Sequence, residues 1–257
     1  MGLSSPVSRR WAEAWQRSWD ELEVRHVPNR EQWIGALIDV LDAIGAERPT
    51  VLDLACGTGT VTRRLLQRRP AARSIAVDVD PVLLTIASAT FDGDDRVRIV
   101  RADLRSPAWI DAVPEQPVDA ALTATALHWL SESTVRRLYT DLARLIRPGG
   151  VFAHAEVMPM VDLPILGIGL ARVARQRRNA DLPDGRSDWN AWWENAARDP
   201  ALRAASEERR AIFPTNYPSE EFSPPAEWHV NALRDAGFTE AGVVWRSGPG
   251  AVVGAVR

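Results

Sequence analysis

Residues 50–156 alternate between short apolar runs and longer amphipathic segments. The apolar runs have the length and composition of buried strands, and they read TVLDLA, SIAVDV, VRIVRAD, DAALTAT and VFAHAEV. The segments between them repeat apolar residues at helical spacing, as in TVTRRLLQRR, DPVLLTIASATF and SESTVRRLYTDLARLIRPGG, the last closed by Pro-Gly-Gly. Strands that are apolar on both sides and alternate with helices predict a mostly parallel α/β sheet with helices on both faces.

The segments on either side of this alternation have a different pattern. Residues 1–48 contain two predicted helices, the first with Trp11, Trp15 and Trp19 on one face. Residues 157–227 are rich in charge, tryptophan and proline and predict an insertion of helices and loops. Residues 228–257 return to the earlier pattern, with a helix and then two strands joined by a Gly-Pro-Gly turn. We therefore divide the chain into 1–48, 49–156, 157–227 and 228–257.

Composition narrows the class of protein. The 257 residues are 46% hydrophobic and 25% charged, which is ordinary for a globular protein, and the net charge of −3 implies no general affinity for nucleic acid. No apolar run approaches the ~20 residues of a membrane span. Cys56 is the single cysteine, so a disulfide framework is excluded and a cytoplasmic location is expected. Nothing in the sequence indicates the oligomeric state.

The loop after the first strand carries the first candidate site. It reads Asp53-x3-Gly57-x-Gly59, and its glycines let a ligand approach the backbone closely. A dinucleotide-binding loop has a third glycine three residues further on, where this chain has Thr62. A diphosphate at this helix start is therefore disfavoured, although the loop alone leaves it open.

Two further acids follow the next two strands. Asp78 ends SIAVD, at the position from which a carboxylate accepts hydrogen bonds from a ribose diol. Asp103 ends the third strand, next to where an adenine would lie, and its expected partner is the exocyclic amine. Because the carboxyl ends of parallel strands share one edge, these acids should converge with Asp53 on a ligand with a ribose, an adenine and a cationic tail.

The motifs VLDLACGTGT, IAVDVDPVLL, VRADL, ALTATALHWL and LARLIRPGGVFA together resemble the class I S-adenosylmethionine-dependent methyltransferases. ALHWL is similar to the trans-aconitate-methyltransferase-like branch of small-molecule enzymes. The resemblance covers roughly residues 48–156 and the closing LRDAGF…AVVGAVR. It implies a Rossmann-like sandwich with a seven-stranded, mostly parallel sheet whose last strand is antiparallel. It also implies S-adenosylmethionine as the methyl donor.

The resemblance carries a set of cofactor-binding residues. It places Asp53 and Gly57 in the loop at the methionine side, Asp78 at the ribose, and Asp103 with Leu104 at the adenine. Thr123 and Ala124 fall where the family lines the sulfonium and methionine, although this branch often has Asn at the second position. The complete expected set is Asp53, Ala55, Cys56, Gly57, Gly59, Asp78, Val79, Asp103, Leu104, Thr123 and Ala124. We assign no metal ligands.

Two histidines are candidate catalytic residues. His128 follows the fourth strand at the expected mouth of the pocket, and His154 lies near the end of the fifth strand. A hydroxyl acceptor needs a general base, for which histidine is the natural group, whereas a carboxylate or a free amine needs none. The alternative for His128 is that it only packs against the cofactor or bonds the backbone.

The function we expect is methyl transfer to an oxygen, nitrogen or carboxylate of a small-molecule acceptor, driven mainly by alignment in a closed pocket. Residues 1–48 and 157–227 would form a lid over the acceptor. Three alternatives remain: an RNA or protein methyltransferase, a nicotinamide-dependent oxidoreductase, and a non-catalytic S-adenosylmethionine-binding protein. The charge of −3 and the absence of a base-amine motif after the fourth strand disfavour the first, and Thr62 with the three acids disfavours the second.

Overall fold

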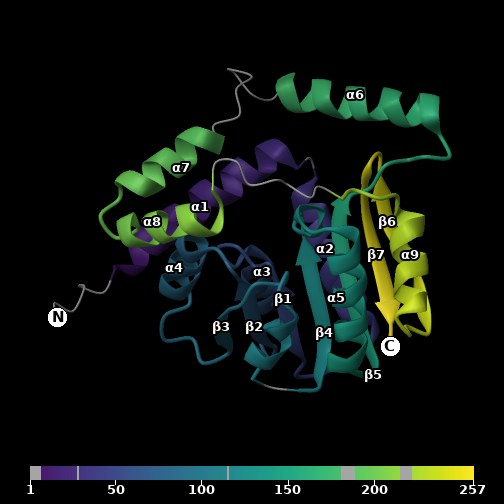
Figure 1. Ribbon diagram of the computed structural model, residues 1–257, viewed down its shortest axis with the longest axis horizontal. Helices are drawn as coiled ribbons and strands as arrows, with labels where there is room; N and C mark the ends of the chain where they lie inside the picture. Colours follow the sequence, from purple (N-terminus) through teal and green to yellow (C-terminus); the bar gives the residue numbers. More distant parts are fainter. Residues whose placement is uncertain (1–6, 28, 115, 181–188, 215–221) are drawn as a thin grey trace.

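The computed structural model describes residues 7–27, 29–114, 116–180, 189–214 and 222–257. Its centre is a seven-stranded sheet with the order β3-β2-β1-β4-β5-β7-β6 (Figure 1). β7 pairs antiparallel with both β5 and β6, and the other neighbouring strands pair in parallel. The strands are β1 Thr50–Leu54, β2 Arg73–Asp78, β3 Val97–Arg101, β4 Val118–Ala124, β5 Ile146–Val157, β6 Glu240–Ser247 and β7 Gly250–Val256.

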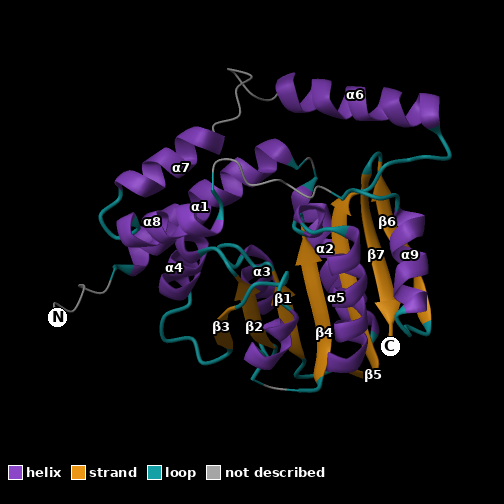
Figure 2. Cartoon of the chain, viewed as in Figure 1, coloured by secondary structure: helices purple, strands orange, loops and turns teal. Residues whose placement is uncertain are grey.

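Helices cover both faces of the sheet, as Figure 2 shows. On one face α2 (Arg30–Ala43) and α3 (Thr60–Arg68) pack on apolar residues that include Val51, Leu122 and Val252. On the other face α5 (Glu132–Leu145) and α9 (Ala226–Asp235) enclose the second core with the short helix η1 (Pro107–Ala112). The parallel α/β sandwich predicted from the apolar runs is confirmed, including the hairpin at the end of the chain.

Helix α4 (Pro81–Thr90) begins where its sequence predicts. The Asp80 carboxylate accepts hydrogen bonds from the backbone N–H groups of Val82 (2.9 Å) and Leu83 (3.3 Å), and Pro81 occupies the first helical position. Such a cap stabilises a helix by about 1 kcal/mol. The cap also fixes the start of α4 directly after β2, which holds the carboxyl end of β2 in place.

The expected end of the next helix is wrong by several residues. α5 ends at Leu145, and β5 starts at Ile146, so Pro-Gly-Gly lies within the strand and does not close the helix. Arg147 precedes Pro148 and is therefore disfavoured in helical conformation, and Ile146 one residue earlier is already extended. Its buried side chain joins the core beneath β4. The helix therefore stops before the sequence signal that we expected to stop it.

The described parts of the outer segments are helical. α1 (Arg9–His26) precedes α2, and residues 157–227 contain α6 (Pro164–Ala180), α7 (Trp189–Arg198) and α8 (Arg203–Ile212). α7 and α8 lie against α1 and α4, whereas α6 extends away from the sheet with Ile165 exposed (Figure 1). No helix in the described ranges is long and apolar enough to cross a membrane.

The tryptophans of the outer helices pack on one another. Trp19 from α1 lies edge-on against Trp192 from α7, with ring centroids 4.9 Å apart. Asp199 accepts hydrogen bonds from the indole N–H groups of both Trp11 (2.8 Å) and Trp15 (2.9 Å). These contacts join α1 to α7, and α1, α7 and α8 lie together on the β3 side of the sheet (Figure 1).

Candidate active site

The loop between β1 and α3 depends on glycine at two positions. Gly57 has φ +57° and Gly59 has φ +85°, in the left-handed region that costs other residues about 1–2 kcal/mol. A Cβ on Gly59 would also lie 2.4 Å from the Phe91 ring. Asp53 stabilises the same turn, since its carboxylate accepts from the N–H (2.9 Å) and hydroxyl (2.7 Å) of Thr62. The acid within the apolar strand therefore holds the first turn of α3.

Asp78, at the end of β2, binds the glycine loop between β1 and α3. Its Oδ2 accepts from Gly57 N–H (2.8 Å), and its Oδ1 accepts from Val79 N–H (2.7 Å) and Asp80 N–H (2.9 Å). Burial raises the pKa of Asp78 to about 6, against the lowering effect of these bonds. A carboxylate oxygen can accept two hydrogen bonds. Oδ2 thus keeps the capacity for one further donor, which suits a ribose hydroxyl.

Asp103 is bound by a neighbour that the sequence reasoning did not consider. Arg105 contacts it through its backbone N–H and its guanidinium, with Nη2 2.7 Å from Oδ2. Burial would raise the pKa of Asp103, but the bonds from Arg105 hold it below its usual value. The carboxylate is therefore ionised at the end of β3, and Leu104 beside it is buried in the core. Its contact with an adenine amine stays a prediction.

Helix α1 covers the glycine loop. Trp19 Nε1 lies 3.7 Å from the position of a Cβ on Gly57, and Gln16 Nε2 donates to Thr60 Oγ1 (3.0 Å). Thr60 in turn donates to Asp20 (2.6 Å). These contacts place the N-terminal helix directly over the turn that leads into α3.

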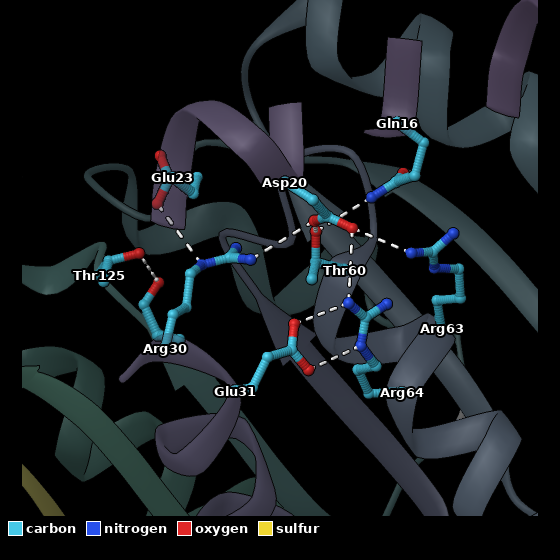
Figure 3. Close-up of polar contacts among 10 residues, drawn as sticks. Gln16, Asp20, Glu23, Arg30, Glu31, Thr60, Arg63, Arg64 and Thr125 are labelled. Atoms are coloured by element: carbon cyan, nitrogen blue, oxygen red, sulfur yellow. Dashed lines mark hydrogen bonds and ion pairs between the residues drawn. The ribbon is translucent and has the colours of Figure 1, made fainter. Parts of the chain in front are cut away.

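Asp20 is the centre of a charged cluster that joins three helices (Figure 3). It forms ion pairs with Arg63 (2.9 Å) and Arg64 (3.6 Å) of α3 and with the buried Arg30 (3.4 Å) of α2. Arg30 also lies 3.6 Å from Glu23 of α1. Sequence reasoning missed this cluster, because its members are far apart in the chain and each resembles an ordinary surface charge.

Several buried groups near the loop have unused hydrogen-bonding capacity. Among the described residues the hydroxyls of Thr58 and Thr123 have no hydrogen-bond partner, although both side chains are fully buried. Such groups cost about 1–3 kcal/mol each when unpaired. Ala124, the next residue of β4, has no polar side chain to offer. Burial raises the pKa of the Cys56 thiol well above its usual value, which favours an inert packing role.

His128 is paired with an acid that sequence reasoning missed. It lies in the short helix η2 (Leu127–Trp129), and its Nδ1 is 2.8 Å from Oε2 of Glu156 on β5. Burial would raise the pKa of Glu156, but the bond from His128 and the nearby His154 hold it at about 2. An ionised carboxylate can only accept, so Nδ1 of His128 carries the proton. Neutral His128 then has an unprotonated Nε2, as a general base requires.

His154 lies behind this pair. Its ring is fully buried, and its Nε2 is 3.9 Å from Glu156 Oε2. Glu156 could have been noticed in the sequence, since it falls two residues after His154 and two-residue spacing in a strand puts side chains on one face. Direct contact of His154 with an acceptor is disfavoured by its complete burial, and its catalytic role stays a prediction.

The comparisons with known proteins agree with this geometry. Residues 51–150 match the family model described as "Methyltransferase domain". Among solved structures, the chain is similar to human N-acetylserotonin methyltransferase in complex with SAM, with a TM-score of 0.57 and 15% identity, covering 97% of this chain and 56% of that one. An O-methyltransferase family protein from Burkholderia thailandensis gives a TM-score of 0.56 at 19% identity, covering 86% of this chain and 55% of that one.

The strand order, the glycine loop and the acids at the strand ends are similar to those of class I S-adenosylmethionine-dependent methyltransferases, and residues 51–150 match a methyltransferase domain. Domains of this class take S-adenosylmethionine as methyl donor. The unpaired hydroxyls of Thr58 and Thr123 and the remaining acceptor capacity of Asp78 fit such a polar ligand.

Within this class the chain is similar to trans-aconitate 2-methyltransferases. The protein of that name from Azoarcus sp. (strain BH72) is 38% identical over 140 residues, which are 52% of this chain and 51% of the relative. The one from Streptomyces avermitilis is 31% identical over 142 residues, which are 53% of this chain and 49% of the relative. The chain thus spans about half the length of the curated relatives that it matches.

Proposed function

We propose that this protein transfers a methyl group from S-adenosylmethionine to an oxygen atom of a small-molecule acceptor. The observation that carries the proposal is the 2.8 Å contact between His128 Nδ1 and Glu156 Oε2, beside the carboxyl end of β4. This pair presents an imidazole whose tautomer is fixed by a buried anion. Such an arrangement suits the removal of a proton from an acceptor hydroxyl.

The bound cofactor supplies an electrophilic methyl group on a sulfonium. Asp78 Oδ2 would accept a hydrogen bond from a ribose hydroxyl. Trp19 would cover the glycine loop between β1 and α3 and exclude water from it. The proton of the acceptor hydroxyl would pass to Nε2 of His128 while its oxygen bonds to the methyl carbon, and the methyl–sulfur bond would break to leave S-adenosylhomocysteine. The Nδ1–H of His128 stays bonded to Glu156, whose negative charge stabilises the imidazolium that forms. A carboxylate acceptor would need no proton transfer, so His128 would not act as a base toward it.

The names of the relatives support oxygen as the atom that is methylated. Trans-aconitate carries nucleophilic oxygens and no nitrogen, and another relative, 29% identical over 122 residues, is a malonyl-[acyl-carrier protein] O-methyltransferase from Paenibacillus sp. (strain JDR-2). A small acceptor fits the position of α1 over the cofactor loop, and the net charge of −3 gives no attraction to nucleic acid. We propose that residues 1–48 and 157–227 close over the acceptor as a lid.

The test is a transfer assay with methyl-labelled S-adenosylmethionine and a panel of small carboxylic and hydroxy acids, beginning with trans-aconitate. His128→Ala should reduce turnover by about 10²–10⁴-fold for a hydroxyl acceptor, the usual contribution of a general base. Affinity for S-adenosylhomocysteine, measured by calorimetry, should stay within a factor of three in the same variant. Full turnover in His128→Ala would reject the assigned role, and absence of S-adenosylhomocysteine binding in the wild type would reject the function.

A further inference from the structure

A row of buried polar side chains lies behind Glu156. The Tyr139 hydroxyl is 2.7 Å from His229 Nδ1, and the His229 ring meets the His154 ring edge-on with centroids 4.8 Å apart. His154 Nε2 is in turn 3.9 Å from Glu156 Oε2. The row joins α5, α9 and β5, and it leads from the core to the His128–Glu156 pair.

His154 has an unsatisfied ring in this row. Neither of its nitrogens has a hydrogen bond to any part of the chain that the structure describes, and its side chain is 0% exposed. A buried ring with two unpaired nitrogens is costly. Its Nε2 is about 1 Å beyond normal hydrogen-bond distance from Glu156 Oε2, so a hydrogen bond between them needs a shift of about that size.

The other groups in the row are neutral. Burial lowers the pKa of His229 to about 2, and burial raises the pKa of Tyr139 well above its usual value. A buried tyrosine hydroxyl therefore serves as donor to the unprotonated Nδ1 of His229. His229 and Tyr139 fix the surroundings of His154 but add no charge. Glu156 Oε1 accepts the backbone N–H of Val157 (3.0 Å), and among the side chains that face Glu156, His154 and His128 are left to stabilise its anionic form.

The charge of Glu156 matters because it decides where the pair holds its protons. If the Glu156 carboxylate is strongly basic, the His128–Glu156 pair holds two protons near neutral pH. The second of these protons is then on Nε2 of His128, which can no longer act as a base. A second N–H directed at Glu156 opposes this, since it stabilises the carboxylate and weakens its pull on a proton at His128. Glu23 of α1 also faces His128 and acts in the opposite direction when ionised.

We propose that His154 is a positioning residue that donates Nε2–H to Glu156 and so keeps Nε2 of His128 unprotonated and able to accept a proton. The effect of His154 on catalysis rests on the function proposed above. The positions of the protons on His154 and His128 do not depend on that function. His154 never touches the acceptor. It acts through Glu156, while His229 and Tyr139 hold its ring in place.

The chain suits a direct test, because it contains only four histidines. Nitrogen-15 spectra of the full chain labelled at histidine report which ring nitrogen of each carries a proton, as a function of pH, and need no acceptor. In the wild type we expect Nε2–H at His154 and Nδ1–H at His128 under mildly alkaline conditions. An unprotonated Nε2 at His154 would overturn the proposal without any variant.

Two substitutions at one position extend the test. His154→Phe removes the donor, and the pH at which His128 Nε2 loses its proton should rise by about one unit, a tenfold change in proton concentration. His154→Gln restores a side-chain N–H and should return that pH toward the wild-type value. An unchanged titration of His128 in folded His154→Phe contradicts the inference. If His154→Phe does not fold, the wild-type spectrum and His154→Gln decide the question. Failure of methyl transfer with this protonation pattern intact would instead count against the proposed function.

Discussion

Asp78 offers the sharpest prediction about cofactor binding. Asp78→Ala removes the acceptor at Oδ2 and also releases the Gly57 N–H that the carboxylate holds at 2.8 Å. A hydrogen bond to a charged group contributes about 1.5–3 kcal/mol, and 1.4 kcal/mol corresponds to a factor of ten in affinity. Since three of the four acceptor positions of Asp78 already bind the backbone, one ribose hydroxyl is the most that Oδ2 adds. Affinity for S-adenosylhomocysteine should therefore fall by roughly ten- to a hundredfold.

Titration calorimetry measures this directly. The matched control is Asp39→Ala, which removes an aspartate whose side chain is 64% exposed and pairs with Arg68 on the surface. The control should bind S-adenosylhomocysteine like the wild type. Circular dichroism should confirm that both variants fold. A dissociation constant for Asp78→Ala within a factor of three of the wild type would refute the ribose assignment and the reading of this strand end as a cofactor site.

Three further predictions concern the loop and the helix above it. Gly59→Ala should destabilise the protein more than Gly93→Ala does. Both positions have positive φ, but only at Gly59 would the new Cβ lie 2.4 Å from the Phe91 ring. Urea unfolding of the two variants tests this, and equal losses of unfolding free energy would argue against the contact. Asp20→Asn leaves three arginines without their shared anion and should cost about 3 kcal/mol or more, with Asp39→Asn as control; a loss below ~1 kcal/mol means the cluster does not hold α1 in place. Burial raises the pKa of Asp53 to about 6, so the folded protein binds a proton at this carboxyl more tightly than the unfolded chain does. The contribution of this proton to the free energy of unfolding is therefore complete below about pH 4 and is lost as the pH rises through 6. Asp53→Asn should reduce that fall in unfolding free energy, and an unchanged pH dependence would show that Asp53 does not cause it.

Local patterns predicted the fold well where contacts are near in sequence. The helix in DPVLLTIASATF, the glycine loop after the first strand and the closing hairpin follow from a few adjacent residues each. The alternation of apolar runs was enough for the centre of the sheet because β1, β2, β4 and β7 are almost entirely buried, whereas the edge strands β3 and β6 are only partly buried. The end of α5 was misplaced, since the packing of Ile146 beneath β4 overrides the more visible Pro-Gly-Gly signal.

The candidate site was predicted less completely because much of it depends on distant partners. Asp53 was expected at the ligand, and its side chain binds Thr62 nine residues away. Glu156 pairs with His128 across two strands, and Asp20 meets Arg63 across two helices. None of these pairings has a local signature. Sequence spacing identified which strand ends carry acids, and only the folded chain shows what each acid binds.

The central claim is that the His128–Glu156 pair serves methyl transfer to an oxygen. The most direct measurement compares the turnover of wild type, His128→Ala and Glu156→Gln with methyl-labelled S-adenosylmethionine and the best hydroxyl acceptor in the panel. We expect a loss of about a hundredfold or more in His128→Ala and a smaller loss in Glu156→Gln, both with S-adenosylhomocysteine affinity retained. Wild-type turnover in both variants, with transfer to the same oxygen, would contradict it.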